Sequence, residues 1–205
     1  MENSNKKKLV EKVKTDEKKF TAKRLFIAII LPNSAKNYLY KITSDLNRRD
    51  KDIRAIPAEN VHLTLKFLGD TPTDKIHKIA EAVKKTAGSF DKFTYEISDN
   101  LGAFTGFNSA RILFVPVSDG KVMIQKIFNN LEDNLSKIKI KKEGRNFICH
   151  ITVARIREKK NIGETVKDLK LEYREKLLCS KLTLFESVLR SSGAEYIILE
   201  EFELK

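Results

Sequence analysis

The 205-residue chain has little of what marks disulfide-stabilised, redox-active or membrane-spanning proteins. Its two cysteines, Cys149 and Cys179, are too few for a disulfide framework and lack the CxxC spacing of a redox or zinc site. No apolar run approaches the roughly eighteen residues that a membrane helix needs, and no segment has the pattern of a signal peptide. We therefore expect a cytoplasmic protein with reduced thiols and no membrane segment.

Acidic residues are also in short supply. Forty Lys and Arg residues face 28 Asp and Glu residues, which gives a formal net charge of +12. The field of such a surface attracts polyanions, so nucleic acid is a candidate partner. A lysine-rich solvated surface is the commoner origin of such an excess, and charge alone therefore does not decide the function.

Hydrophobic residues make up 41% of the chain, enough to bury a core in one domain or in two small lobes fused into one. The exception is the first 22 residues, which are rich in Lys and Glu and poor in apolar side chains. We expect residues 1–22 to form a basic N-terminal arm, frayed or disordered, and residues 23–205 to form the folded domain.

Within the domain, hydrophobic patterning predicts strands and helices in alternation. Strands are expected at Leu25–Leu31, Val61–Leu68 (closed by Gly69–Asp70), Phe93–Ile97, Arg111–Val117, Phe147–Ile156, Leu177–Leu189 and Tyr196–Phe202. Helices are expected around residues 38–46, 76–83 and 122–138. The segment Asn100–Asn108 contains two glycines and is expected to be a loop.

The two halves of the chain carry a faint repeat. A strand that opens with Arg24 leads through a helix to a strand with His62, 38 residues later, and one that opens with Arg111 leads through a helix to His150, 39 residues later. Chance recurrence of a common α/β unit is the alternative. If the repeat is real, the halves should pack as related lobes with helices on an outer face.

Two of the three histidines stand in nearly the same tetrapeptide, HLTL at residues 62–65 and HITV at residues 150–153. Side chains alternate along a strand, so His62 and Thr64 should face one way while Leu63, Leu65 and Phe67 face the core. The second strand should likewise present His150 and Thr152 together. For one such strand a chance solvent-facing pair is the favoured explanation, but two copies in matching places favour a site.

Two imidazoles with unperturbed pKa values near 6.5 suit acid–base catalysis of a displacement at phosphorus. One can take a proton from the attacking oxygen while the other gives a proton to the departing oxygen. The threonine hydroxyls can donate hydrogen bonds to the non-bridging oxygens. Because the sequence has no His/Asp/Glu cluster at metal-ligand spacing, we expect neither a metal nor a cofactor.

The chain resembles the RNA 2′,3′-cyclic phosphodiesterases, also called 2′-5′ RNA ligases, of the two-histidine phosphoesterase superfamily. The resemblance runs from Lys23 to Lys205 and rests on the segments KRLFIAIILP, PAENVHLTLKFLGD, ARILFVPV, CHITVARIR and LTLFESVLRSSGAEYIILEEFEL. It implies an α+β, bilobal fold of two pseudo-symmetric lobes, each an antiparallel sheet with outer helices, around a central cleft.

The resemblance also implies an enzyme that hydrolyses the terminal 2′,3′-cyclic phosphate of RNA to a 2′-phosphate, with reverse 2′-5′ ligase activity. His62 would be the proton donor to the departing 3′ oxygen, and His150 the proton acceptor that activates water. Thr64 and Thr152 would hold the phosphate. The two tetrapeptides are chemically almost equivalent, so this assignment rests on the resemblance, and a reverse reaction would exchange the roles.

Four further residues are candidates for substrate binding. Arg155 completes the family's HxTxxR pattern and could pair with phosphate, provided that a bulge turns it to the face of His150; a structural salt bridge is the alternative. Phe26 matches a family aromatic and could stack on a base, although a core position is the commoner role of such a residue. Arg111 and Tyr196 are plausible cleft residues that are more often structural.

Expected partners are RNA ends with a 2′,3′-cyclic phosphate, among them tRNA fragments, and the protein is expected to be a monomer that does not bind membranes. Two alternatives stay open. The first is a basic RNA-binding module without turnover, against which the matched acid and base groups count. The second is a related phosphodiesterase acting on 2′,5′-oligonucleotides or on ADP-ribose cyclic phosphate.

Overall fold

The computed structural model describes residues 21–191 and 193–205, so the predicted arm at residues 1–22 lies almost wholly outside the described residues. The strands are β1 (Ala22–Ile30), β2 (Ile53–Ala55), β3 (His62–Pro72), β4 (Phe93–Ile97), β5 (Gly102–Phe104), β6 (Ala110–Asp119), β7 (His150–Lys160), β8 (Leu177–Cys179), β9 (Lys181–Arg190) and β10 (Gly193–Glu203). The helices are α2 (Asn33–Arg49), α3 (Ile76–Ala87), α4 (Lys121–Lys137) and the single turn α5 (Gly163–Val166).

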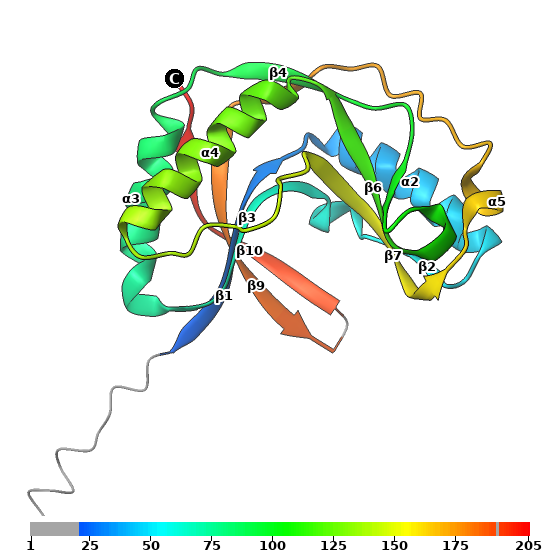
Figure 1. The fold of residues 1–205 in the computed structure, drawn as a ribbon, viewed down its shortest axis with the longest axis horizontal. Helices are drawn as coiled ribbons and strands as arrows, with labels where there is room; N and C mark the ends of the chain where they lie inside the picture. The colour runs from blue at the N-terminus through cyan, green and yellow to red at the C-terminus, as the bar shows by residue number, and fades with distance from the viewer. Residues whose placement is uncertain (1–20, 192) are drawn as a thin grey trace, which may run out of the picture.

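The strands form one curled sheet in the order β10-β9-β1-β3-β7-β6-β4-β8, with β2 added to β7 and β5 added to β6. Each described strand pair is antiparallel. The sheet bends where β3 meets β7, because these two strands pair only at Leu63 and Ile151 (Figure 1). The α+β fold with two antiparallel lobes is therefore confirmed.

The helices of the two repeat units, α2 and α4, each pack on the lobe of the other unit (Figure 1). Helix α3, which follows β3, packs against β9 and β10. Helix α2, which follows β1, lies against β2 and β7. Helix α4, which precedes β7, lies beside α3 and reaches β3, where Glu132 forms an ion pair with Lys66. The repeat predicted from the sequence thus builds two lobes that exchange their helices.

The core is continuous across both lobes. Apolar side chains of β1, β3, β6 and β7 meet those of α2, α3 and α4 in one buried cluster. Within the described ranges, none of the helices combines the length and the hydrophobicity that crossing a bilayer would require.

The structure corrects the predicted orientation of Phe67. Strict alternation placed this ring in the core, but 67% of its surface is exposed. The register between β1 and β3 shifts between Ile27 and Ala28, so β3 has one extra residue there, and both Leu65 and Lys66 are buried. This bulge reverses the alternation and brings Phe67 to the face of His62.

Other differences concern short or interrupted strands. Strand β3 continues through Gly69, where a second register shift and a φ of +66° replace the predicted strand end. The predicted loop Asn100–Asn108 contains β5, and the single strand predicted over Leu177–Leu189 is divided into β8 and β9. Strand β2, only three residues long, was not predicted.

A buried ion pair fixes the segment that leads into β7. Lys66 Nζ lies 2.7 Å from Glu132 Oε1, and both side chains are only 7% exposed. Lys66 Nζ also donates to the carbonyl of Lys141, at 2.9 Å, and the backbone N–H of Glu143 donates to Glu132 Oε2, at 2.6 Å. The pair therefore ties β3 and α4 to the chain just before His150.

Glu132→Gln should lower the free energy of unfolding by about 3 kcal/mol, because it leaves the Lys66 ammonium buried without its counter-charge. Adding Lys66→Met should recover part of that loss. Asp133→Asn is the matched control. Asp133 is on the same helix as Glu132, and its exposed ion pair with Lys142, in the segment after the helix, should be worth less than about 1 kcal/mol. Urea denaturation measures the free energy of unfolding of all three variants. Equal losses for Glu132→Gln and Asp133→Asn would contradict the conclusion that the Lys66–Glu132 pair is buried and stabilising.

Candidate active site

The register of β3 and β7 brings the two histidine strands together. Leu63 pairs with Ile151, and both side chains are completely buried. Antiparallel pairing around this point sets His62 toward Thr152 and Thr64 toward His150, all on the face opposite the core. The four side chains that the sequence selected therefore lie on one face at the junction of the lobes, and each is half-buried.

His62 is enclosed by aromatic rings. It stacks on Phe26 with ring centroids 4.8 Å apart, and the edge of Tyr196 lies 5.3 Å away. Phe185 stacks in turn on Phe26, with ring centroids 4.9 Å apart. Nδ1 of His62 lies 2.8 Å from the carbonyl oxygen of Asn60. The ring is thereby fixed in orientation by packing and by one hydrogen bond.

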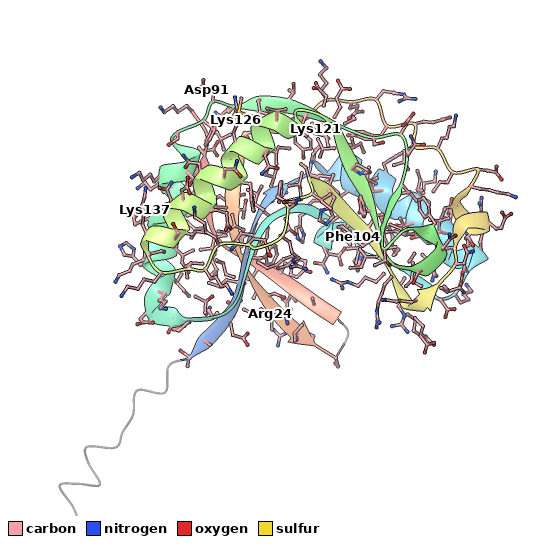
Figure 2. All side chains as sticks on the ribbon, in the orientation of Figure 1. Arg24, Asp91, Phe104, Lys121, Lys126 and Lys137 are labelled. Atoms are coloured by element: carbon pink, nitrogen blue, oxygen red, sulfur yellow. The ribbon has the colours of Figure 1, made fainter. Side chains whose placement is uncertain are left out.

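His150 has an equivalent but less enclosed environment. Its Nδ1 lies 2.6 Å from the carbonyl oxygen of Ile148, again two residues earlier in the chain. Phe104 and Phe114 approach with ring centroids 4.9 and 5.3 Å away. Gly102 allows this arrangement, because a Cβ at that position would lie 2.5 Å from the Phe114 ring. Figure 2 shows Phe104 near β6 and β7.

These hydrogen bonds set the chemistry of both rings. A carbonyl oxygen can only accept, so Nδ1 of each imidazole must carry a proton. In the neutral ring the free Nε2 then has a lone pair and is a base, and in the protonated ring Nε2–H is an acid. The same geometry can therefore serve either role, as the near-identity of the two tetrapeptides indicated.

Burial lowers the pKa of both rings. Burial lowers the pKa of His62 to about 4. The hydrogen bond to the Asn60 carbonyl raises this pKa by a smaller amount, and the charges of Lys36 and His150 lower it further. Burial also lowers the pKa of His150, opposed by the Ile148 carbonyl. In the free protein at neutral pH His62 is therefore neutral, and an anion beside it would favour its protonated form.

The four substrate-binding candidates are placed differently. Arg155 is exposed and lines a cavity together with Phe26 and Tyr196. The register between β6 and β7 skips Val153, and this extra residue in β7 is the bulge that the orientation of Arg155 requires. Phe26 is only 1% exposed, so it would act on a substrate chiefly through the His62 ring. Arg111 is an exposed residue of β6 outside that cavity lining.

Sequence reasoning missed two residues next to His62. Asn60 accepts from the imidazole through its carbonyl, and its side-chain Nδ2 donates to the carbonyl of Ala194 at 2.8 Å. A backbone acceptor leaves no trace in the sequence. Lys36, on the first turn of α2, is half-buried and lowers the pKa of His62 by its charge; only the fold brings it there.

Cys149, beside His150 in the chain, has its thiol pKa raised to about 12 by burial, so it stays protonated.

Within the part of the chain that the structure describes, no three His, Cys, Asp or Glu side chains gather in a way that could hold a metal ion.

Comparison with known families gives one match across most of the chain. The family model described as LigT like phosphoesterase matches residues 29–113 and 115–196. A relative from Methanocaldococcus jannaschii, named RNA 2′,3′-cyclic phosphodiesterase, is 25% identical over 87% of this chain and 99% of its own length. A relative of the same name from Aquifex aeolicus is 25% identical over 88% of this chain and 97% of its own.

Solved structures support the same fold. A protein from Thermus thermophilus superimposes with a TM-score of 0.75 at 21% identity, covering 88% of this chain and 97% of its own. E. coli LigT in complex with 3′-AMP also gives a TM-score of 0.75 at 21% identity, covering 90% and 99%.

The pKa of His62 should be about 4 in the free protein, and Phe26→Ala should raise it toward 6.5, because removal of the stacked ring admits water to the imidazole. NMR titration of the histidine ring signals measures both values. The single variants His62→Gln, His150→Gln and His77→Gln assign the three signals. A His62 signal that titrates at or above 6.5 in the unmodified protein would contradict the burial argument.

Proposed function

This chain belongs to the LigT-like phosphoesterase family, and from that membership we propose that it hydrolyses the terminal 2′,3′-cyclic phosphate of RNA to a 2′-phosphate. The name shared by the relatives, RNA 2′,3′-cyclic phosphodiesterase, supports this substrate. The observation that carries the proposal is the pair of HxT strands on one face, with both Nδ1 atoms bound to carbonyl oxygens. The net charge of +12 suits an RNA partner.

In the proposed reaction, Nε2 of neutral His150 takes a proton from water as the water oxygen bonds to phosphorus. The bond from phosphorus to the 3′ oxygen breaks, and Nε2–H of protonated His62 gives its proton to that oxygen. The products are a 2′-phosphate and a 3′-hydroxyl. Thr64 and Thr152 donate hydrogen bonds to the non-bridging oxygens, whose charge grows during the step.

The low pKa of His62 constrains this mechanism. The imidazole is neutral in the free protein, so it must gain its proton as the substrate arrives. A phosphodiester anion beside the ring favours protonation, since opposite charges within about 4–6 Å stabilise each other. Lys36 opposes that gain in the free protein, and a bound anion would offset its charge.

The proposal includes the joining of a cyclic phosphate end to a 5′-hydroxyl at the same site, as a 2′-5′ ligase. In joining, the 5′-hydroxyl takes the place of water: His150 takes its proton, the 3′ oxygen leaves and His62 protonates it. His62 and His150 exchange roles only in the opposite direction, cleavage of the 2′-5′ linkage, in which the 3′ oxygen attacks. RNA ends, tRNA fragments among them, are the proposed partners of a monomeric protein.

Incubation with an RNA oligonucleotide that ends in a 2′,3′-cyclic phosphate should give a 2′-phosphate product. Chromatography against authentic 2′- and 3′-phosphate standards identifies it. The rate should survive EDTA, because no step needs a metal ion, and it should follow a bell-shaped pH profile. A 3′-phosphate product would mean that the other oxygen leaves. Faster turnover of a 2′,5′-oligonucleotide or of ADP-ribose cyclic phosphate would reassign the substrate.

His62→Ala and His150→Ala should each lower kcat by about two to four orders of magnitude, because each removes one of the two proton transfers. His77→Ala is the matched control: this histidine is exposed on α3, and its loss should leave kcat unchanged. Full turnover by either active-site variant would refute the acid–base assignment. Thermal denaturation of the same samples separates loss of chemistry from loss of folding.

A further inference from the structure

A cavity of about 850 Å³ adjoins the histidine pair on the side of His62. Its lining includes Phe26, Asn60 and Tyr196, three of the residues around His62, but neither histidine and neither site threonine. The volume falls within the range of about 300–1,000 Å³ that is typical of ligand pockets. We call it the arginine cavity, because Arg24, Arg54, Arg155 and Arg190 line it.

Two of these arginines stand directly opposite each other. Arg54 of β2 pairs with Arg155 of β7 in the antiparallel register, and both are exposed. Their Cβ atoms are therefore about 5 Å apart, a spacing at which like charges destabilise a sheet. Among the described residues neither forms an ion pair within 4.0 Å, although the charge of Arg54 acts on Asp52 at longer range. A cost of this kind is offset when an anion lies between the two guanidinium groups.

Arg24 and Arg190 contribute the other wall, from β1 and the β9–β10 hairpin. Arg24 lies near that hairpin in Figure 2. It stands opposite Asp70 in the register of β1 and β3, but the two side chains form no ion pair within 4.0 Å. Arg190 is partly neutralised, because its Nε donates to Glu195 at 2.9 Å. The only other carboxylate in the lining is Glu59, so the cavity has an excess of positive charge.

The lining also has an exposed apolar part. Phe67, which the bulge in β3 turns outward, is 67% exposed, and Leu189 of the β9–β10 hairpin is 69% exposed. Large apolar side chains such as these two are more often buried. An aromatic face next to guanidinium groups fits a ligand that carries a flat ring and a phosphate, as each nucleotide of single-stranded RNA does.

We propose that the arginine cavity is a subsite for the nucleotide that precedes the cyclic-phosphate end of RNA. Arg54 and Arg155 bind its phosphodiester, and Phe67 stacks on its base. This inference rests on the proposed function, because the terminal phosphate must lie over His62 and His150 for its neighbour to reach the cavity. The enzyme is then one that recognises at least a dinucleotide end.

The test compares a nucleoside 2′,3′-cyclic phosphate with a dinucleotide that ends in the same group. The unmodified protein should show a KM about tenfold lower for the dinucleotide, since one charge-assisted phosphate contact is worth about that factor. Arg54→Gln should lower the ratio of the two KM values severalfold, and so should Phe67→Ala, because each variant removes one contact and leaves the others in place. Equal KM values in the unmodified protein would overturn the proposal.

Arg157→Gln is the matched control. Arg157 is an exposed arginine of β7 that lies two residues from Arg155 and outside the cavity lining, so its loss should leave the KM ratio as it was. A structural role for Arg54 has a separate signature. Because Arg54→Gln removes a like-charge neighbour of Arg155, its melting temperature should not fall below that of the unmodified protein. A fall of several degrees would mark Arg54 as structural and contradict the proposal.

Calorimetric binding separates this inference from the proposed function. The probes are a nucleoside 2′-monophosphate and a dinucleotide ending in a 2′-phosphate. Tighter binding of the dinucleotide, with a salt dependence reduced by about 0.7 in log–log slope in Arg54→Gln, supports the subsite even if no cyclic phosphate is hydrolysed. Hydrolysis together with equal binding of both probes overturns the subsite and leaves the proposed function intact.

Discussion

The site depends on one point of contact between two strands. Leu63 and Ile151 form the only described pair between β3 and β7, and both are fully buried. Their burial is favourable for the same reason as that of any core side chain, removal of apolar surface from water. Because side chains alternate along a strand, the polar neighbours of these two residues must then lie on the face opposite the core. The hydrophobic effect thus places two imidazoles and two hydroxyls side by side, without any direct bond among them.

The enclosure of His62 by aromatic rings has two opposing effects on its chemistry. Aromatic rings hold the imidazole in place but remove it from water, and this lowers its pKa to about 4. In the proposed mechanism His62 is an acid that is unprotonated when the site is empty, so it becomes competent only when negative charge enters. If that mechanism holds, burial of the ring also selects anionic ligands. The Asn60 carbonyl partly offsets the effect of burial on the pKa of His62.

Much of this arrangement could be predicted because it follows from periodicity. Alternation along HLTL and HITV was enough to put the four polar side chains on one face, and the family resemblance supplied the antiparallel fold. Phe67 was misplaced because a bulge adds one residue, and nothing in the local sequence marks that bulge. Asn60 was not predicted because it acts on His62 through its backbone carbonyl. Arg54 was not predicted because its strand has three residues, too few for a periodic signal.

The exchange of helices between the lobes bears on how such a fold can arise. A lone strand–helix–strand unit of this kind would leave its own sheet bare, since α2 covers β7 and α4 reaches β3. Two identical units could cover each other across a twofold axis, with one histidine from each at the axis. A duplicated and fused gene would inherit that symmetric pair of imidazoles. The difference in enclosure between His62 and His150 would then be the later specialisation of two originally equivalent rings.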